Sequence, residues 1–283
     1  MTTSGNPAGS EARSVVGAAV LRFVAAWALV FSTTSLLLYA VGWLRSGGDP
    51  ARVAGEALRF ALSRAGVMGA ACVSAGVLAA LALTGLRDGS SIAARLRLGR
   101  TRASAVGWLA ALAGMGGLSA AAGAAASALR ELLGAAGGTL ELIGHALSRP
   151  SPPALLLQLL TIAILPGAAE EMFFRGLLQT RLVAGLRRWP AILLTAAAFG
   201  LIHFDPFHSV LAFVAGTYLG WLTEHFGSIR PAMGAHVFNN ALFVLFVAAG
   251  PDEEPGPPDA RRSSPGGPRY VSRRPPWRAP RSR

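Results

Sequence analysis

Long apolar runs separated by short breaks of arginine and other polar residues make up most of this chain. An uncharged apolar run of about 17–25 residues is long enough to cross a bilayer as an α-helix. The runs that reach or approach this length are 23–44, 65–86, 103–129, 154–169, 190–204, 209–226 and 231–250. The pattern therefore predicts an all-α fold, a polytopic transmembrane helix bundle.

Two segments between these runs have a mixed pattern. Residues 131–147 contain Glu131, Glu141, His145 and several glycines, so they form a loop, an interfacial helix or a further span. The prediction is therefore about seven or eight spans in total. Residues 175–188 combine arginines with apolar positions, a pattern typical of a helix that lies on the membrane surface.

The composition supports a membrane protein, and the placement of the positive charge argues against nucleic-acid binding. The chain is 52% hydrophobic and 14% charged, with a mean hydropathy of +0.47, whereas soluble domains carry about 25% charged residues. The formal net charge is +12, and all 26 basic residues are arginines that lie mostly in the breaks and the C-terminal tail. Charges in these places orient a membrane protein, so we expect no nucleic-acid partner. The arginines of the tail and those between the spans favour opposite orientations of the protein in the membrane, so the sequence does not assign an orientation.

Polar side chains interrupt the apolar pattern in three later fragments. They are Glu-Glu-Met-Phe-Phe-Arg at 170–175, Phe-Gly-Leu-Ile-His at 199–203 and His-Val-Phe-Asn-Asn at 236–240. Ionisable groups at membrane depth are costly, so they usually face a cavity, pair with each other and serve a function. The three fragments together predict a buried hydrolytic site.

The two carboxylates of the first fragment are expected to have different roles. Glu171 and Arg175 are four residues apart, so they share a helix face and can form an ion pair. Glu170 points about 100° away and stays free to act as a general base. The alternative is an inert pair of charges at a helix end.

The other two fragments offer imidazole and amide groups. His236 and Asn240 are four residues apart, so both can donate to one point, as stabilisation of an oxyanion requires. His203 follows Phe199 by four residues on a short apolar helix. The alternative for these side chains is structural, because histidine and asparagine also form hydrogen bonds between membrane helices.

The combined pattern, E-E-x-x-x-R, then F-x-x-x-H, then H-x-x-x-N, resembles the CAAX protease and bacteriocin-processing (CPBP, or Abi) family of intramembrane endopeptidases. The resemblance covers roughly residues 150–249. It implies that Glu170 activates a water molecule together with His203. It also implies that His236 and Asn240 stabilise the tetrahedral oxyanion, and that the Glu171–Arg175 pair supports the site.

A metal-dependent version of this site stays open. Glu170, His203 and His236 could supply a His₂Glu zinc site with one free coordination position. The H-E-x-x-H motif of soluble zinc proteases is absent from the sequence. We favour a glutamate-activated water and leave a divalent metal such as zinc as the alternative cofactor.

The resemblance organises the chain into four expected parts. They are a polar N-terminal segment at 1–14, N-terminal transmembrane helices at 15–150, a CPBP-like catalytic transmembrane core at 151–250 and a disordered Pro/Arg-rich tail at 251–283. The first apolar run is too long for the core of a signal peptide, so we expect an uncleaved first span. The tail lacks the apolar residues needed to form a core.

The expected activity is hydrolysis of a peptide bond in a membrane-associated protein or peptide. The lipid bilayer is the other partner, and we expect an integral protein of a bacterial inner membrane. A prenylated C-terminal tripeptide is the precedent among eukaryotic members, but no residue here indicates prenyl binding. The alternatives are a non-enzymatic membrane adaptor or immunity protein on the same scaffold, and a proton-coupled transporter, for which no inverted repeat is detectable.

Other polar residues are predicted to be structural. His208 and His225 lie near span ends, where a solvated or interfacial position is expected, and Asp205 precedes a proline in a turn. Asn239 points about 100° away from its neighbour Asn240, so it is expected to pack between helices. The G-x-x-x-G spacing at 216–220 permits close helix contact. Because Cys72 is the only cysteine, no intrachain disulfide can form.

Overall fold

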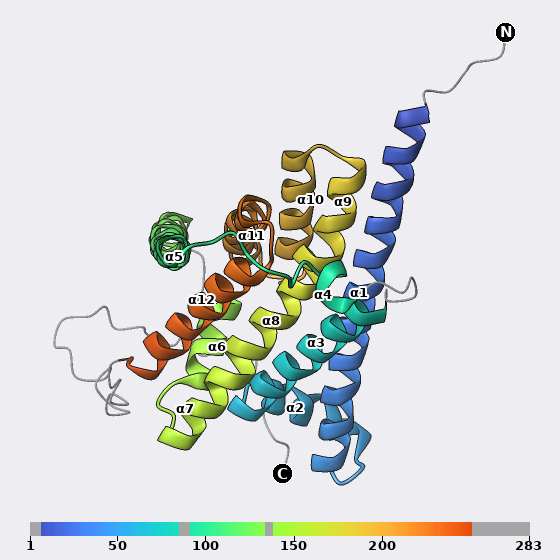
Figure 1. Ribbon diagram of the computed structural model, residues 1–283. Coiled ribbons are helices and arrows are strands. Elements are labelled where there is room, and N and C mark those ends of the chain that lie inside the picture. The colour runs from blue at the N-terminus through green and yellow to red at the C-terminus, as the bar shows by residue number, and fades with distance from the viewer. Residues whose placement is uncertain (1–6, 85–90, 134–137, 251–283) are drawn as a thin grey trace, which may run out of the picture. The chain divides into compact units, whose positions relative to one another are not determined.

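The computed structural model describes residues 7–84, 91–133 and 138–250 (Figure 1). Every regular element in these ranges is a helix, which confirms the all-α prediction. In chain order the elements are α1 (Pro7–Arg45), α2 (Pro50–Ala61), α3 (Arg64–Thr84), α4 (Ile92–Arg95), α5 (Ala105–Leu133), α6 (Thr139–Leu147), α7 (Pro152–Gln158), η1 (Leu159–Ile164), α8 (Leu165–Glu171), η2 (Met172–Gln179), α9 (Thr180–Gly185), α10 (Arg188–Leu201), α11 (Pro206–Phe226) and α12 (Arg230–Ala248). The tail predicted to be disordered lies outside the described residues.

Five helices are long and apolar enough to cross a membrane, by length and composition. They are Ala12–Arg45, Arg64–Thr84, Ala105–Leu133, Pro152–Gly185 and Arg230–Ala248. Many of their large apolar side chains point outward, as a lipid-facing surface requires. The chain is thus an integral membrane protein.

The remaining predicted spans differ from these five. The run 190–204 forms α10, an apolar helix of 14 residues that is short for a crossing, and the run 209–226 lies in α11. The ambiguous segment 131–147 is divided between the end of α5 and α6, and the nine residues of α6 are too few to cross.

The helix that carries both glutamates is continuous over 34 residues, from Pro152 to Gly185. The prediction of a surface helix at 175–188 was wrong for its first part. Residues 173–179 are all buried, including the guanidinium of Arg175, because α3, α10 and α11 pack around this turn.

Two π-helical segments, η1 and η2, interrupt the α-helical hydrogen bonding on either side of the glutamates. Such π-helical turns occur frequently at functional sites.

The connection between α10 and α11 is a short, tightly bonded turn. Asp205 caps α11 by accepting a hydrogen bond from the backbone N–H of His208 at 2.7 Å, and its second oxygen accepts from the N–H of Thr139 at 3.0 Å. These hydrogen bonds hold the pKa of the Asp205 carboxyl below its ordinary value, and the one from His208 contributes most. The turn position predicted for Asp205 is confirmed, and the turn fixes the backbone next to His203.

Candidate active site

A fully buried ion pair lies at the centre of the candidate site. Arg175 Nη1 donates to Glu171 Oε1 at 2.6 Å, and neither side chain is exposed. Arg175 Nη2 donates to the backbone carbonyl of Gly216 on α11 at 3.0 Å, and the guanidinium lies 4.6 Å from the centre of the Phe199 ring. The pair therefore joins η2 to both α10 and α11, while Glu171 Oε2 and Arg175 Nε are buried without a hydrogen-bond partner among the described residues.

His236 brings α12 to the same carboxylate. Its Nδ1 lies 2.8 Å from Glu171 Oε1, and a carboxylate can only accept, so Nδ1 carries the donated proton. Its Nε2 lies 3.6 Å from Glu170 Oε2. The Glu170 side chain is 16% exposed, whereas that of Glu171 is not exposed at all. One carboxylate thus holds the histidine and the arginine, and the other is free beside the same imidazole.

Phe199 separates the two candidate histidines. Its ring is edge-to-face with His203 at 5.2 Å and with His236 at 5.5 Å between centroids. His203 Nδ1 lies 2.8 Å from the carbonyl oxygen of Phe199, which only accepts, so Nδ1 donates and Nε2 keeps its lone pair. The F-x-x-x-H spacing therefore fixes which nitrogen of His203 is available to a substrate or a water.

Asn240 is near the site but turned toward the helix that carries the glutamates. Its Nδ2 makes a long contact, 3.5 Å, with the carbonyl oxygen of Ile162. The carbonyl oxygen of Ile162 receives no hydrogen bond from Pro166, four residues later, because proline has no N–H. Asn239 instead accepts a hydrogen bond from Ser119 on α5 at 2.5 Å. Within the described part of the chain, no hydrogen bond links Asn240 or His203 to either glutamate.

The geometry only partly fits a zinc site. The separation of His236 Nε2 and Glu170 Oε2, 3.6 Å, suits two ligands of one tetrahedral ion with metal–ligand bonds of about 2.0–2.2 Å. No group of three His, Cys, Asp or Glu side chains among the described residues is arranged to hold a metal ion. His203, the third ligand in the metal-dependent alternative, is therefore not placed with the other two.

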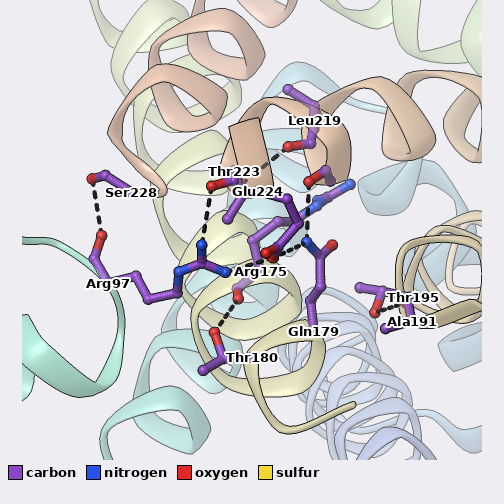
Figure 2. A network of polar contacts seen from close by, with 11 residues as sticks. Arg97, Arg175, Gln179, Thr180, Ala191, Thr195, Leu219, Thr223, Glu224 and Ser228 are labelled. Atoms are coloured by element: carbon purple, nitrogen blue, oxygen red, sulfur yellow. Dashed lines mark hydrogen bonds and ion pairs between the residues drawn. The ribbon is translucent and has the colours of Figure 1, made fainter. Parts of the chain in front are cut away.

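Three further polar residues, which the sequence patterns did not single out as functional, support the helix of the glutamates. Figure 2 shows Gln179, Glu224 and Arg97 meeting beside η2. Gln179 Nε2 donates to the carbonyl of Gly220 at 3.0 Å and to Glu224 Oε1 at 2.9 Å. Arg97 Nη1 donates to the same Glu224 oxygen at 2.5 Å.

Arg175 and Gln179 form two successive contacts of the same kind. They are four residues apart on one helix, and the carbonyls that they reach, those of Gly216 and Gly220, are four residues apart on α11. A Cβ at Gly220 would lie 2.7 Å from the Gln179 side-chain oxygen, and one at Gly216 would lie 3.2 Å from Arg175 Nη2. The G-x-x-x-G spacing therefore makes room for polar side chains to reach the α11 backbone.

Arg97 extends this network to the connection that precedes α5. Its carbonyl accepts hydrogen bonds from the Ser228 hydroxyl at 2.9 Å and from the Ile229 N–H at 3.1 Å. These contacts tie the connection to the turn between α11 and α12 (Figure 2). The sequence alone did not mark Arg97 as part of this network, because it resembles the other arginines between the spans.

We expect Glu224→Gln to lower the free energy of unfolding by about 1.5–3 kcal/mol, because hydrogen bonds to a charged group are lost in a largely buried place. Reversible unfolding of the purified protein in detergent measures this change. Glu56→Gln is the matched control, since Glu56 and Arg59 also pair at 2.5 Å but the Arg59 side chain is 66% exposed. This control should show no measurable change. Equal effects of the two substitutions would contradict a supporting role for Glu224.

His208 lies closer to the candidate site than its predicted solvated position. Its ring centroid is 4.2 Å from that of His203, and its Nδ1 is buried without a hydrogen-bond partner. His208 therefore packs against His203, whereas His225 is exposed and stacks on Trp221 at 5.0 Å.

Residues 152–242 match the family model described as type II CAAX prenyl endopeptidase Rce1-like. No curated protein and no solved structure matches the chain. The matched segment begins at the helix that carries the two glutamates and includes all three sequence fragments of the candidate site. This similarity supports a peptidase. Over residues 152–242 the chain is thus similar to the type II CAAX prenyl endopeptidase Rce1-like family.

Proposed function

We propose that this protein is an intramembrane endopeptidase that hydrolyses a peptide bond in a membrane-associated protein or peptide with a glutamate-activated water. One observation carries the proposal. Glu171 is held by Arg175 and His236, while Glu170, the next residue, makes no hydrogen bond within the described residues and faces the same imidazole. A free carboxylate beside an oriented histidine is the arrangement that general-base catalysis needs.

In the proposed reaction, a water molecule lies between Glu170 and His203 Nε2. Glu170 takes a proton as the water oxygen attacks the carbonyl carbon, and the carbonyl oxygen becomes an oxyanion. The proton then passes from Glu170 to the amide nitrogen as the C–N bond breaks. The products are a carboxylic acid and an amine, so no covalent enzyme intermediate is needed.

The oxyanion would be stabilised by His236 and Asn240. His236 already donates from Nδ1 to Glu171, so its Nε2 donates to the oxyanion when it also carries a proton. Asn240 can turn from its long contact with Ile162 at little cost. One such donor is typically worth about 10²–10³ in rate.

The test of this function is a comparison of membranes that contain the wild type or Glu170→Gln at matched protein levels. Mass spectrometry of new peptide termini should show a set that is present with the wild type and absent with Glu170→Gln. Glu141→Gln, a substitution of an exposed glutamate on α6, should leave the set intact. Identical termini in all three membranes, with the deletion phenotype rescued by Glu170→Gln, would favour a non-enzymatic adaptor.

The membrane in which the protein works is part of this proposal. We place it in the inner membrane of a bacterium, with the substrate segment reaching the site from the bilayer or its surface. The prenylated C-terminal substrates named for the matched family are one class to examine among the termini.

A further inference from the structure

His208 lies outside the three sequence fragments of the candidate site, yet its ring packs against that of His203. The two ring centroids are 4.2 Å apart, with 57° between the ring planes. Favourable pairs of aromatic rings usually lie about 4.5–7 Å apart, so the two imidazoles are in close contact. The proposed reaction uses His203 and leaves His208 without a role.

The backbone on both sides of this contact is fixed by the turn between α10 and α11. The N–H of Asp205 donates to the carbonyl oxygen of His203 at 2.8 Å, and the Asp205 carboxylate accepts from the N–H of His208. A Cβ on Gly200 would lie 2.6 Å from the carbonyl oxygen of Ser209, so the backbones of α10 and α11 are in close contact beside the turn. The two histidines can therefore change their contact only by rotating their side chains.

Aromatic side chains of α1 hold the same turn. Phe204, the residue after His203, has a φ of +58°, which bulky residues rarely adopt. Its ring centroid lies 5.3 Å from that of Trp27 and 6.1 Å from that of Phe31, both on α1. A strained conformation persists where the surrounding structure determines it, so the backbone next to His203 has a defined conformation.

The remaining freedom of His203 is rotation of its ring. The torsion about the Cβ–Cγ bond of histidine has broad preferences, so the backbone alone does not fix the ring. Nδ1 donates to the carbonyl oxygen of Phe199 at 2.8 Å, and the ring contacts that of Phe199 and, more closely, that of His208. Nε2, the nitrogen that contacts the water in the proposed reaction, moves when the ring rotates. The ring contacts therefore decide where Nε2 stays.

His208 contributes a ring to this arrangement rather than a hydrogen bond. Its Nδ1 is buried without a hydrogen-bond partner, and its side chain makes no hydrogen bond within the described residues. A phenyl ring could make the same contact with His203 and would leave no buried nitrogen unpaired. This difference separates the role of the ring from that of the nitrogens.

We infer that His208 is a positioning residue for the hydrolysis, because its ring keeps the His203 imidazole in the orientation in which Nε2 meets the attacking water. This inference rests on the proposed function, in which His203 and Glu170 hold that water. His208 acts through His203 and contacts neither the water nor the peptide.

The experiment measures kcat and KM of the purified full-length protein on an internally quenched peptide that spans a cleavage site mapped in the membranes. His208→Ala should lower kcat roughly 10–100-fold and change KM by less than about twofold, because misplacement of a catalytic group costs rate rather than binding. His208→Phe keeps a ring against His203, so its kcat should stay within about threefold of the wild type. His225→Ala is the matched control, since His225 also stacks on a ring of α11 but is exposed, and it should leave both constants unchanged.

A double-mutant cycle tests whether His208 acts through His203. In a His203→Ala background, His208→Ala should lower kcat by less than about twofold more, because the group that it positions is gone. The rates of these slow variants are measured at high enzyme concentration, and size-exclusion profiles show that each variant is folded.

Three results would overturn the inference. They are an equal loss of kcat in both backgrounds, a raised KM with unchanged kcat, and a His208→Phe variant as slow as His208→Ala. The last two would assign His208 a direct contact with the peptide or the water. Glu170→Gln separates the two levels of the proposal: if it retains the wild-type rate, the proposed function fails, and if it is slow while His208→Ala is not, only the role of His208 fails.

Discussion

Glu170→Gln is expected to lower the rate of peptide hydrolysis by the purified protein by about 10²–10⁴-fold, the usual contribution of a general base. Glutamine keeps the size of the side chain and its place beside His236 but cannot accept the proton of the attacking water. The measurement is the initial rate on an internally quenched peptide that spans the cleavage site found in the membranes. The free energy of unfolding should stay unchanged, because Glu170 makes no hydrogen bond within the described residues.

Removal of metal separates the two mechanisms that share Glu170. With glutamate-activated water, a zinc chelator such as 1,10-phenanthroline should leave the wild-type rate unchanged. Loss of activity with the chelator and its recovery with added zinc would favour the metal-dependent mechanism, in which Glu170 is a candidate ligand. Retention of more than half of the wild-type rate by Glu170→Gln would exclude this residue from both mechanisms.

The local part of the site could be predicted from residue spacing. Glu171 and Arg175 are one helical turn apart, and the structure contains the ion pair that this spacing predicts. His203 likewise bonds to the carbonyl of Phe199, four residues earlier on the same turn. Both interactions are set by the geometry of a single helix, so neighbouring residues contain all the information they need.

The contacts between helices could not be predicted in the same way. His236 meets Glu171 across 65 residues of sequence, and the choice of Glu171 over Glu170 as its partner depends on how α12 packs. The π-helical segments η1 and η2 change the rotation of the residues that follow them, and nothing in the apolar pattern marks them. The family resemblance placed these residues in one site, but their hydrogen-bond partners come from packing alone.

Burial of charge was the least predictable feature. The arginines at 175–188 formed an amphipathic pattern that favoured a surface helix, yet Arg175 is fully buried because an acid, a backbone carbonyl and an aromatic ring surround it. Arg97 looked like an orientation charge between spans, yet it pairs with Glu224 beside the helix of the glutamates. A sequence shows where a charge lies along the chain, but its partner decides whether it can enter the protein.

Arg175→Met should lower the free energy of unfolding by about 3–5 kcal/mol, because it leaves the Glu171 carboxylate buried without its cation. Methionine fills most of the space of the arginine stem, so the lost charge accounts for most of the change. Equilibrium unfolding of the purified protein in detergent measures it. Arg59→Met is the control, since Arg59 also lies one turn from its acid but is 66% exposed, and it should behave like the wild type.

A second substitution tests whether the stranded charge is the cause. Glu171→Gln added to Arg175→Met removes the buried charge and keeps an amide oxygen that can accept from His236 Nδ1. The double variant should therefore recover most of the lost stability, since uncharged replacements of a buried ion pair are often neutral. Its hydrolysis rate should stay low, because an imidazole that faces a neutral amide lacks the carboxylate that stabilises its protonated form in the transition state. A double variant as unstable as Arg175→Met would show that the arginine acts mainly through Gly216 and Phe199, and that the ion pair itself contributes little.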